Sequence, residues 1–523
     1  MTLRLRDTYR RRVVEVQPLE PGRLRMYSCG PTVYRYAHVG NLRTFLLPDL
    51  IRRVAIYHGL EVVHVQNITD VGHMRDERFD RGEDRMLVAA GLENRSPAEI
   101  ADAYEAAFHA DAAAVNLLPA HVYPRATEHV DDMIELAERL EDAGYAYASA
   151  AGNVYFSVAA FPGYGRLSGN SLDELRAGHR GEVEPDKRDP ADFALWKAAG
   201  EGRLLKWPTT RWGEGSPGWH IECSAMSLRH LGELFDIHTG GIDNVFPHHE
   251  DEIAQSASLS GHVPARHWVH GEFLLASGRK MAKSAGNFQR ITEVVEDGTD
   301  PLAFRYLALT SRYGRKLNFS ASSLAAAARA LGSLRARLVA LGPPPADGPW
   351  TPPPVLRAGG APDRPVGLAT DVAGHGGPNP DFVTLDRASE AHAPLSEAGR
   401  ELHRRFVEAI DDDLDLPVAL ATIRQALAGG LAVDEARWLA LDADLVLGLD
   451  LDRTWASAGS ASRTPAHADL VAEVEALLAA RASARAGRDY ARADALRDEI
   501  DELGFEVVDG PDGSTARARS GTG

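Results

Sequence analysis

The stretch RMYSCGPTVYRYAHVGN, residues 25–41, decides the fold, because it joins an apolar strand pattern to a glycine-bearing turn and the start of a helix. Residues 24–29 and 61–68 both read as buried strands, and residues 39–59 between them have helical apolar spacing. A strand, a helix and a second strand, with the glycine turn at the end of the first strand, are typical of parallel sheets. The sequence therefore predicts an α/β fold.

His38, Gly40 and Asn41 stand where the first predicted strand gives way to the helix. Glycine lets a phosphate approach the backbone, and the first turn of a helix offers unpaired N–H donors to it. A match of four residues, HVGN, also occurs in ordinary turns before helices. Its position directly after a strand favours a nucleotide-binding role.

A second segment, GRKMAKSAGN at residues 278–287, carries Lys280 and Lys283 between small residues. A mobile loop with two lysines can neutralise the negative charge that develops on a departing diphosphate. Two solvated surface lysines would give the same spacing. The segment's place downstream of HVGN favours the phosphate role.

His248 and Glu252 are four residues apart in PHHEDE, so on a helix both side chains project from one face and can converge on an ion. Such a pair also occurs on ordinary helix surfaces. The residues between them, His249, Glu250 and Asp251, fall off this face, and we expect them to lie behind the ligands or in solvent.

Cys29 and Cys223 are the two cysteines of the chain. A buried, small apolar residue is the ordinary role of an isolated cysteine. Together with His248 and Glu252, however, they offer two thiolates, one imidazole and one carboxylate, which is a donor set suited to zinc.

Composition is that of a globular protein, with 44% hydrophobic and 25% charged residues and a net charge of −18. No run of about 18 apolar residues predicts a membrane span, and the N-terminus has no secretory signal pattern, so we expect a cytoplasmic protein.

The acidic net charge argues against nonspecific polyanion binding. Residues 1–53 nevertheless hold 11 arginines against 4 acidic residues, so a nucleic-acid partner is not excluded.

Composition changes sharply after residue 342, since residues 343–365 contain nine prolines. We predict a loop or disordered linker over residues 343–395, whose removal would leave the fold intact. Helical patterns resume at residues 396–449 and 467–503, and we expect the last tail, residues 510–523, to be loose. Four arginines share one face of the last predicted helix, where they either contact phosphates or form a solvated surface: Arg481, Arg485, Arg488 and Arg492.

Several motifs together resemble the cysteinyl-tRNA synthetase family, a class I aminoacyl-tRNA synthetase family, in order and spacing. The resemblance is strong over residues 1–340 and weaker at residues 406–420 and 484–507. Besides CGPTVYRYAHVGN, the motifs are NITDVGH (67–73), PRATEH (124–129), DPADFALWK (189–197), PGWHIECSAM (217–226), DIHTGGIDNVFPHHEDEIAQS (236–256) and KMAKSAGNF (280–288).

The resemblance implies roles for individual residues, which we carry over as expectations. A zinc ion that binds the substrate thiolate would be held by Cys29, Cys223, His248 and Glu252. Thr69 and Trp219 would line the cysteine pocket with Cys29, although Trp219 could equally be a core aromatic residue and Asp243 a turn former. ATP would contact His38, Gly40, Asn41, Asp243 and Lys283, and the catalytic groups would be His38, Asn41, Lys280 and Lys283.

The family resemblance also implies a domain order. We expect a Rossmann-like parallel-sheet catalytic domain of class I synthetase type, an α-helical anticodon-binding bundle and a small C-terminal module. The boundaries are 1–320 for the catalytic domain, with a connective insertion at about 115–215 and the KMAKS loop at 278–288, then 321–342 for a helical stem-contact region, 343–395 for the linker, 396–460 for the bundle and 461–523 for a C-terminal helical module with a flexible tail.

The sequence departs from the family pattern in four places. The sequence has KMAKS where the family usually has KMSKS, which removes one hydroxyl but keeps both lysines. It also has HTGG where the family usually has HGGG. The proline-rich segment is unusually long, and the terminus GPDGSTARAR lacks the family's usual tryptophan, which weakens the case for anticodon contacts there.

The expected activity is ligation of L-cysteine to tRNA(Cys) with ATP, with Zn²⁺ and ATP-bound Mg²⁺ as cofactors and a monomer as the working form. One rival is a related ligase that passes activated cysteine to a small amine, as in mycothiol synthesis. That relative lacks anticodon-binding domains, whereas this chain continues well beyond the catalytic core. A second rival is a noncatalytic tRNA-binding relative, which the intact motifs disfavour.

Overall fold

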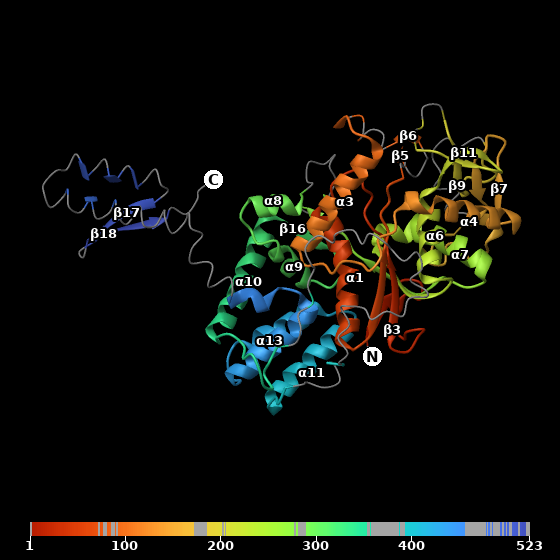
Figure 1. The fold of residues 1–523 in the computed structure, drawn as a ribbon. Coiled ribbons are helices and arrows are strands. Elements are labelled where there is room, and N and C mark those ends of the chain that lie inside the picture. The colour runs from red at the N-terminus through yellow and green to blue at the C-terminus, as the bar shows by residue number, and fades with distance from the viewer. Residues whose placement is uncertain are drawn as a thin grey trace. The chain divides into compact units, whose positions relative to one another are not determined.

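The computed structural model divides the chain into two compact units, Met1–Leu451 and Asp452–Gly523 (Figure 1). It describes all residues except 1–2, 72–73, 77–80, 85–88, 90, 92, 172–185, 201–202, 204, 277–278, 281–288, 353–355, 357–385, 388–392, 456–476, 478–479, 482–483, 485–491, 494–495, 498, 501–504, 511–512 and 519–523. Among the helices in this described part, none is both long and apolar enough to cross a membrane.

A four-stranded parallel sheet forms the centre of the first unit, in the order β13-β12-β3-β4. Its strands are β3 (Arg23–Ser28), β4 (Glu61–Gln66), β12 (Phe235–Gly241) and β13 (Ala265–Gly271). Helix α1 (Val39–Tyr57) connects β3 to β4, so the strand, helix, strand unit predicted from the sequence is confirmed. Every residue of β12 is buried, as expected for a central strand covered on both faces.

Helix α1 carries charges into the interior. Asp49 lies 3.0 Å from Arg53 Nε and 2.6 Å from Arg305 Nη2, and all three side chains are at most 2% exposed. Arg305 belongs to α9 (Leu302–Leu309) and also donates to the carbonyl of Leu447, at the end of α13 (Val433–Leu447), at 2.6 Å. Two distant helices are thereby fixed to α1.

An antiparallel sheet of five strands occupies the region predicted as an insertion, in the order β10-β11-β9-β8-β7 (Figure 1). Helix α4 (Val130–Asp142) precedes it and buries its apolar face, including Met133 and Leu140. The strands are β7 (Ala146–Ala148), β8 (Val154–Phe156), β9 (Phe193–Ala198), β10 (Trp207–Thr209) and β11 (Gly213–Pro217).

The other regular elements complete the two units. The strands are β1 (Arg4–Asp7), β2 (Arg12–Glu15), β5 (Met74–Asp76), β6 (Arg81–Asp84), β14 (Leu274–Ala276), β15 (Arg279–Lys280) and β16 (Leu317–Phe319). The helices are α3 (Pro97–Ala114), α6 (Trp219–Leu231), α7 (Glu250–Ser260), α8 (Ile291–Glu296), α10 (Ala321–Ala340), α11 (Glu397–Asp411) and α12 (Leu416–Ala426), with short turns η1 (Ala126–His129), η2 (Val158–Ala160), η3 (Ile242–Asn244), η4 (Val245–His249) and η7 (Leu451–Arg453). Helices α11, α12 and α13 confirm the helical pattern predicted for residues 396–449.

The end of the second unit differs from the loose tail that we expected. Strands β17 (Phe505–Gly510) and β18 (Gly513–Ala518) pair antiparallel, with Gly510 opposite Gly513. The sequence held the signal, since GPDG is strong turn chemistry and Phe505 and Val507 alternate with polar residues before it. The expectation of a loose tail is therefore wrong over β18.

The linker prediction is also wrong at several of its described positions. Trp350 packs against an apolar cluster that contains Trp438, and Leu356 is 6% exposed. Arg387 is buried, donates its backbone N–H to Tyr57 O at 3.0 Å and places Nε 2.6 Å from Asp442 Oδ1. Isolated large residues in a proline-rich segment thus anchor it to the core.

Replacing Arg387 with methionine should destabilise the first unit by about 3–5 kcal/mol, because the Asp442 carboxylate, whose side chain is 1% exposed, would lose its paired charge. Denaturant unfolding measures the change. Arg404→Met is the matched control, since Arg404 pairs with exposed Glu401 and Glu408 and its loss should leave the free energy of unfolding nearly unchanged. Equal effects of the two substitutions would show that the segment contributes nothing to stability.

Candidate functional site

The predicted site residues gather at the carboxyl edge of the parallel sheet. Cys29 follows β3 directly, and its backbone N–H donates to Thr239 O of β12 at 3.2 Å. Thr69 follows β4, and its backbone pairs with the turn after Cys29 through Thr69 N–H to Pro31 O at 3.0 Å. Ligand sites of open α/β sheets lie at this edge, where successive strands end.

Four of the predicted residues form one cluster, since the ligand atoms of Cys29, Cys223, His248 and Glu252 all lie within 4.8 Å of one another. Cys223 comes from α6, Glu252 from the first turn of α7 and His248 from η4, a wide turn that precedes α7. His248 Nε2 is 3.1 Å from Glu252 Oε1. The two side chains converge as the spacing predicts, although the regular helix begins only at Glu250.

The cluster perturbs the ionisation of its members. Burial disfavours the Cys29 thiolate, but the hydrogen bond with Cys223 and the imidazoles of His249 and His248 hold the pKa of Cys29 well below its usual range. The same hydrogen bond, followed by burial, raises the pKa of Cys223 well above its usual value. Burial lowers the pKa of His248, but the charges of Glu252 and Cys29 outweigh it and raise that pKa to about 9. The site thus favours one thiolate even before a cation enters.

Two histidines that the sequence analysis did not select also contact the cluster. His249 Nε2 lies 3.1 Å from Cys29 Sγ, and His238 Nε2 lies 2.8 Å from Glu252 Oε2. With Cys29 and Glu252 they form a second possible ligand set. His238 could have been found from sequence, because it lies in the strand pattern that leads into the GG turn.

His249, Glu250 and Asp251 are each at most 1% exposed, so a solvent role for them is wrong. The Glu250 carboxylate accepts a hydrogen bond from the backbone N–H of Ser168 at 2.8 Å. The Asp251 carboxylate accepts one from the hydroxyl of Tyr164. These carboxylates fasten the loop after β8 to the start of α7. The burial of Glu250 and Asp251 is explained by this loop, which lies far away in the sequence, whereas His249 contacts Cys29 and His270.

Trp219 and Thr69 flank the cluster. The Trp219 ring lies 5.0 Å from the His248 ring, centroid to centroid, and is partly buried. His220 Nδ1 is 2.8 Å from His248 Nδ1, which leaves Nε2 of His248 directed at Glu252. Thr69 donates its hydroxyl to Glu222 Oε2 at 3.0 Å, one residue before Cys223.

His38 and Asn41 cap the first turn of α1. Asn41 N–H donates to His38 Nδ1 at 3.2 Å, and His38 N–H donates to Asn41 Oδ1 at 3.1 Å. Gly40 is needed here, since a Cβ on it would lie 2.8 Å from the His38 ring. The reciprocal bonds fix both side chains at a helix N-terminus, whose partial positive charge favours a nearby phosphate.

Gln289, which follows the lysine segment, lies beside this helix end. The Val39 N–H donates to Gln289 O at 3.0 Å, which holds the residue after the KMAKS segment beside HVGN. Lys280 ends β15, whose backbone pairs with Leu275 of β14. Lys283 lies outside the described residues, so its predicted role stays a prediction.

Asp243 is exposed in η3, just beyond the end of β12. A Cβ on Gly241 would lie 2.5 Å from Asp243 Oδ1, and a Cβ on Gly240 would lie 2.6 Å from the His249 ring. The two glycines therefore give room to a carboxylate on one side and to the histidine cluster on the other.

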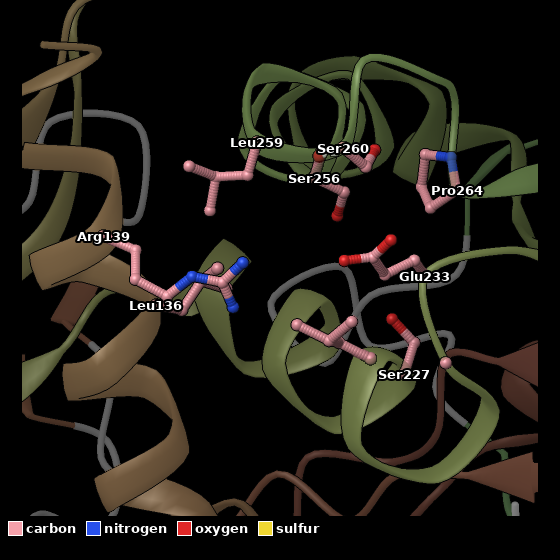
Figure 2. A pocket seen from close by; sticks show the side chains of 10 residues that line it. Leu136, Arg139, Ser227, Glu233, Ser256, Leu259, Ser260 and Pro264 are labelled. Carbon is pink, nitrogen blue, oxygen red and sulfur yellow. Dashed lines mark hydrogen bonds between the residues drawn. The ribbon is translucent and has the colours of Figure 1, made fainter. Parts of the chain in front are cut away.

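A separate groove lies between α4, α6 and α7 (Figure 2). Leu136 and Arg139 face Glu233 and Leu259 across it. None of the site residues predicted from sequence is among the residues that line this groove. The candidate site is therefore the sheet edge and not this groove.

Sequence comparisons agree with the predicted domain types. The family described as tRNA synthetases class I (C) catalytic domain matches residues 15–329, and the cysteinyl-tRNA ligase anticodon binding domain matches residues 467–517. A cysteine–tRNA ligase of Salinibacter ruber is 40% identical over 560 residues, covering 100% of this chain and 99% of the relative. A cysteine–tRNA ligase of Thermus thermophilus is 40% identical over 526 residues, covering 98% of each.

Solved structures share the fold at low sequence identity. A LeuRS of Agrobacterium radiobacter in a ternary complex with tRNA aligns with a TM-score of 0.51 and 11% identity, over 86% of each chain. The methionyl-tRNA synthetase of Mycobacterium tuberculosis bound by methionyl-adenylate aligns with a TM-score of 0.50 and 14% identity, over 82% of this chain and 91% of that one. The chain has the class I synthetase fold, a cluster of possible metal ligands and full-length similarity to cysteine–tRNA ligases. It therefore belongs to the cysteinyl-tRNA synthetase family.

Proposed function

We propose that this chain joins L-cysteine to ATP as cysteinyl adenylate and transfers the cysteinyl group to the 3′-terminal adenosine of tRNA(Cys), releasing AMP and diphosphate. The observation that carries the proposal is the cluster of Cys29, Cys223, His248 and Glu252 at the sheet edge. Two thiols and an imidazole form a soft donor set, which suits an enzyme that must choose a thiol substrate.

The donor chemistry of this cluster fits Zn²⁺. Glu252 Oε1 is buried and has no hydrogen-bond partner in the part of the chain that the structure describes. It faces His248 Nε2, and the other ring nitrogen of His248 contacts His220, as zinc-binding histidines usually require. When bound, zinc would supply a soft Lewis acid that prefers the substrate thiolate over a serine hydroxyl.

The protein's own part in adenylate formation is positioning and charge stabilisation, since the cysteine carboxylate itself attacks the α-phosphate. His38, Gly40 and Asn41 at the start of α1 would bind ATP, and Asp243 would hold the ribose. Lys280 and Lys283 would contact the phosphates with Mg²⁺. Thr69 and Trp219 would line the cysteine pocket.

Transfer to tRNA needs the parts beyond the catalytic unit. The region that matches an anticodon-binding family, residues 467–517, supports tRNA as the acceptor and disfavours a small amine. The anticodon role predicted for residues 396–460 stays a prediction. The cytoplasm is the expected location, because the tRNA pool is found there, and a monomer remains the expected working form.

Purified protein should exchange diphosphate into ATP only when cysteine is present, and it should charge tRNA(Cys) in the same preparation. Serine at equal concentration should give less than about 1% of the cysteine rate, because a thiol-selective site discriminates by several kcal/mol. Exchange without charging of tRNA(Cys) would reject the tRNA ligase assignment in favour of the small-amine rival.

Each chain should bind about one zinc ion, and Cys223→Ser should lose both the metal and cysteine activation, since it removes one of four ligands. Elemental analysis after dialysis measures the metal. His262→Ala is the control, because His262 is exposed and lies outside the cluster. Full activity in a zinc-free wild-type preparation would contradict the zinc assignment.

A further inference from the structure

An exposed aromatic side chain lies beside the start of α1. Tyr36 is 41% exposed, and in the described part of the chain it is the one aromatic residue among the exposed large hydrophobic residues. It stands two residues before His38, which caps α1. A single exposed apolar residue is ordinary on a protein surface, so the neighbours of Tyr36 decide whether it has a binding role.

Two residues from distant parts of the sequence hold the Tyr36 ring. The guanidinium carbon of Arg290 lies 3.5 Å from the centre of the ring, and the Tyr104 ring meets it at 79° with 4.7 Å between centroids. The Tyr104 hydroxyl donates to Glu93. Arg290 directly precedes α8, which packs against α3, the helix of Tyr104 (Figure 1). Tyr36 and Arg290 thus form a stacked pair that has little side-chain entropy left to lose on binding.

The stacked pair carries a positive charge that no described carboxylate neutralises. The Arg290 backbone N–H donates to Glu293 Oε2 at 3.2 Å, but no carboxylate among the described residues lies within 4.0 Å of the Arg290 guanidinium. The same is true of Arg35, which is exposed and precedes Tyr36 in the chain. Burial raises the pKa of Asp111 to about 6, and the charge of Arg290 opposes that rise without an ion pair.

This combination of groups suits a single-stranded nucleic acid. Unpaired bases stack on aromatic rings and on guanidinium planes, and cations beside them attract the phosphates of the strand. The Tyr36 ring and the Arg290 guanidinium offer both kinds of contact in one place.

The position of the pair distinguishes between two ligands that carry a base. The carbonyl of Gln289, one residue before Arg290, accepts the Val39 N–H, so the pair adjoins the helix start where the proposed function places ATP. Small-molecule pockets bury most of their ligand, whereas Tyr36 is open to solvent, which disfavours the adenine of ATP. A strand whose end reacts with the adenylate must run close to the ATP site, and an open surface can stack its bases.

We propose that Tyr36 and Arg290 form a stacking surface for a base in the single-stranded 3′ end of the acceptor tRNA. The inference rests on the proposed function and deepens it by assigning a surface that guides the acceptor strand toward the adenylate. Both are positioning residues, since neither is proposed to touch the reacting atoms. Stacking tolerates any base, so this surface holds the strand and does not select tRNA(Cys) among tRNAs.

Two RNAs test the assignment by equilibrium binding: intact tRNA(Cys), and the same tRNA trimmed of its single-stranded 3′ end. Tyr36→Ala removes the ring and should weaken binding of the intact tRNA about tenfold, while binding of the trimmed tRNA should change less than about twofold. Arg290→Gln should give the same selective loss. Tyr36→Phe keeps the ring and should bind both RNAs like the wild type.

Kinetics separate the strand from ATP. Diphosphate exchange needs no tRNA, so its rate and its KM for ATP should change less than about twofold in Tyr36→Ala and Arg290→Gln, whereas kcat/KM for tRNA(Cys) in charging should fall about tenfold. Arg139→Gln is the charge-matched control, because Arg139 is exposed in the groove of Figure 2. This control should bind both RNAs like the wild type.

Equal losses for the intact and the trimmed tRNA, or unchanged binding of the intact tRNA to Tyr36→Ala, would overturn the inference. A raised KM for ATP in Tyr36→Ala would also overturn it, since the ring would then hold the adenine of ATP. Binding needs no turnover, so these results stand apart from the proposed function. Absence of cysteine-dependent diphosphate exchange in the wild type would contradict that function alone.

Discussion

The buried carboxylate of Asp49 between Arg53 and Arg305 constrains the whole first unit. A charge taken from water costs several kcal/mol unless a partner and further hydrogen bonds compensate it, so these three residues hold α1, α9 and the end of α13 in one arrangement. The same helix α1 begins with His38 and Asn41, whose mutual caps fix the start of the helix. The placement of this helix start therefore depends on a charge group more than two turns away along the helix.

The parallel sheet brings the second half of the site to the same edge. Cys29 follows one central strand, and the neighbouring strand β12 leads through two close-packed glycines into η3 and η4, which deliver Asp243 and His248. Cys223 and His248 are buried and Cys29 is partly buried, whereas Asp243 is exposed. In the proposed function, a thiol-selective pocket and a nucleotide site would thus share one strand end without competing for the same side chains. Selectivity of this kind comes from the donor chemistry, and it requires no second, editing site.

Sequence reasoning succeeded where short-range spacing determines structure. The strand, helix, strand pattern, the place of His38 and Asn41 at the start of the helix, and the pairing of His248 with Glu252 are all local. It failed where partners lie far apart in the chain. Glu250 and Asp251 look like an exposed helix start until the loop at residues 164–168 covers them. Arg387 lies in a segment predicted as a linker, but its guanidinium pairs with the buried carboxylate of Asp442. The hydrogen bonds from the Gly30 N–H to Asn67 and from the Thr69 hydroxyl to Glu222 form only in the folded sheet.

The central claim is that the Cys29, Cys223, His248 and Glu252 cluster holds zinc and presents it to the substrate thiol. X-ray absorption at the zinc edge tests this most directly, because it counts sulfur neighbours of the metal. We predict two sulfur neighbours in the zinc-loaded protein and three after addition of cysteine, with no change after addition of serine. An unchanged count with cysteine, at a concentration that supports diphosphate exchange, would contradict the account.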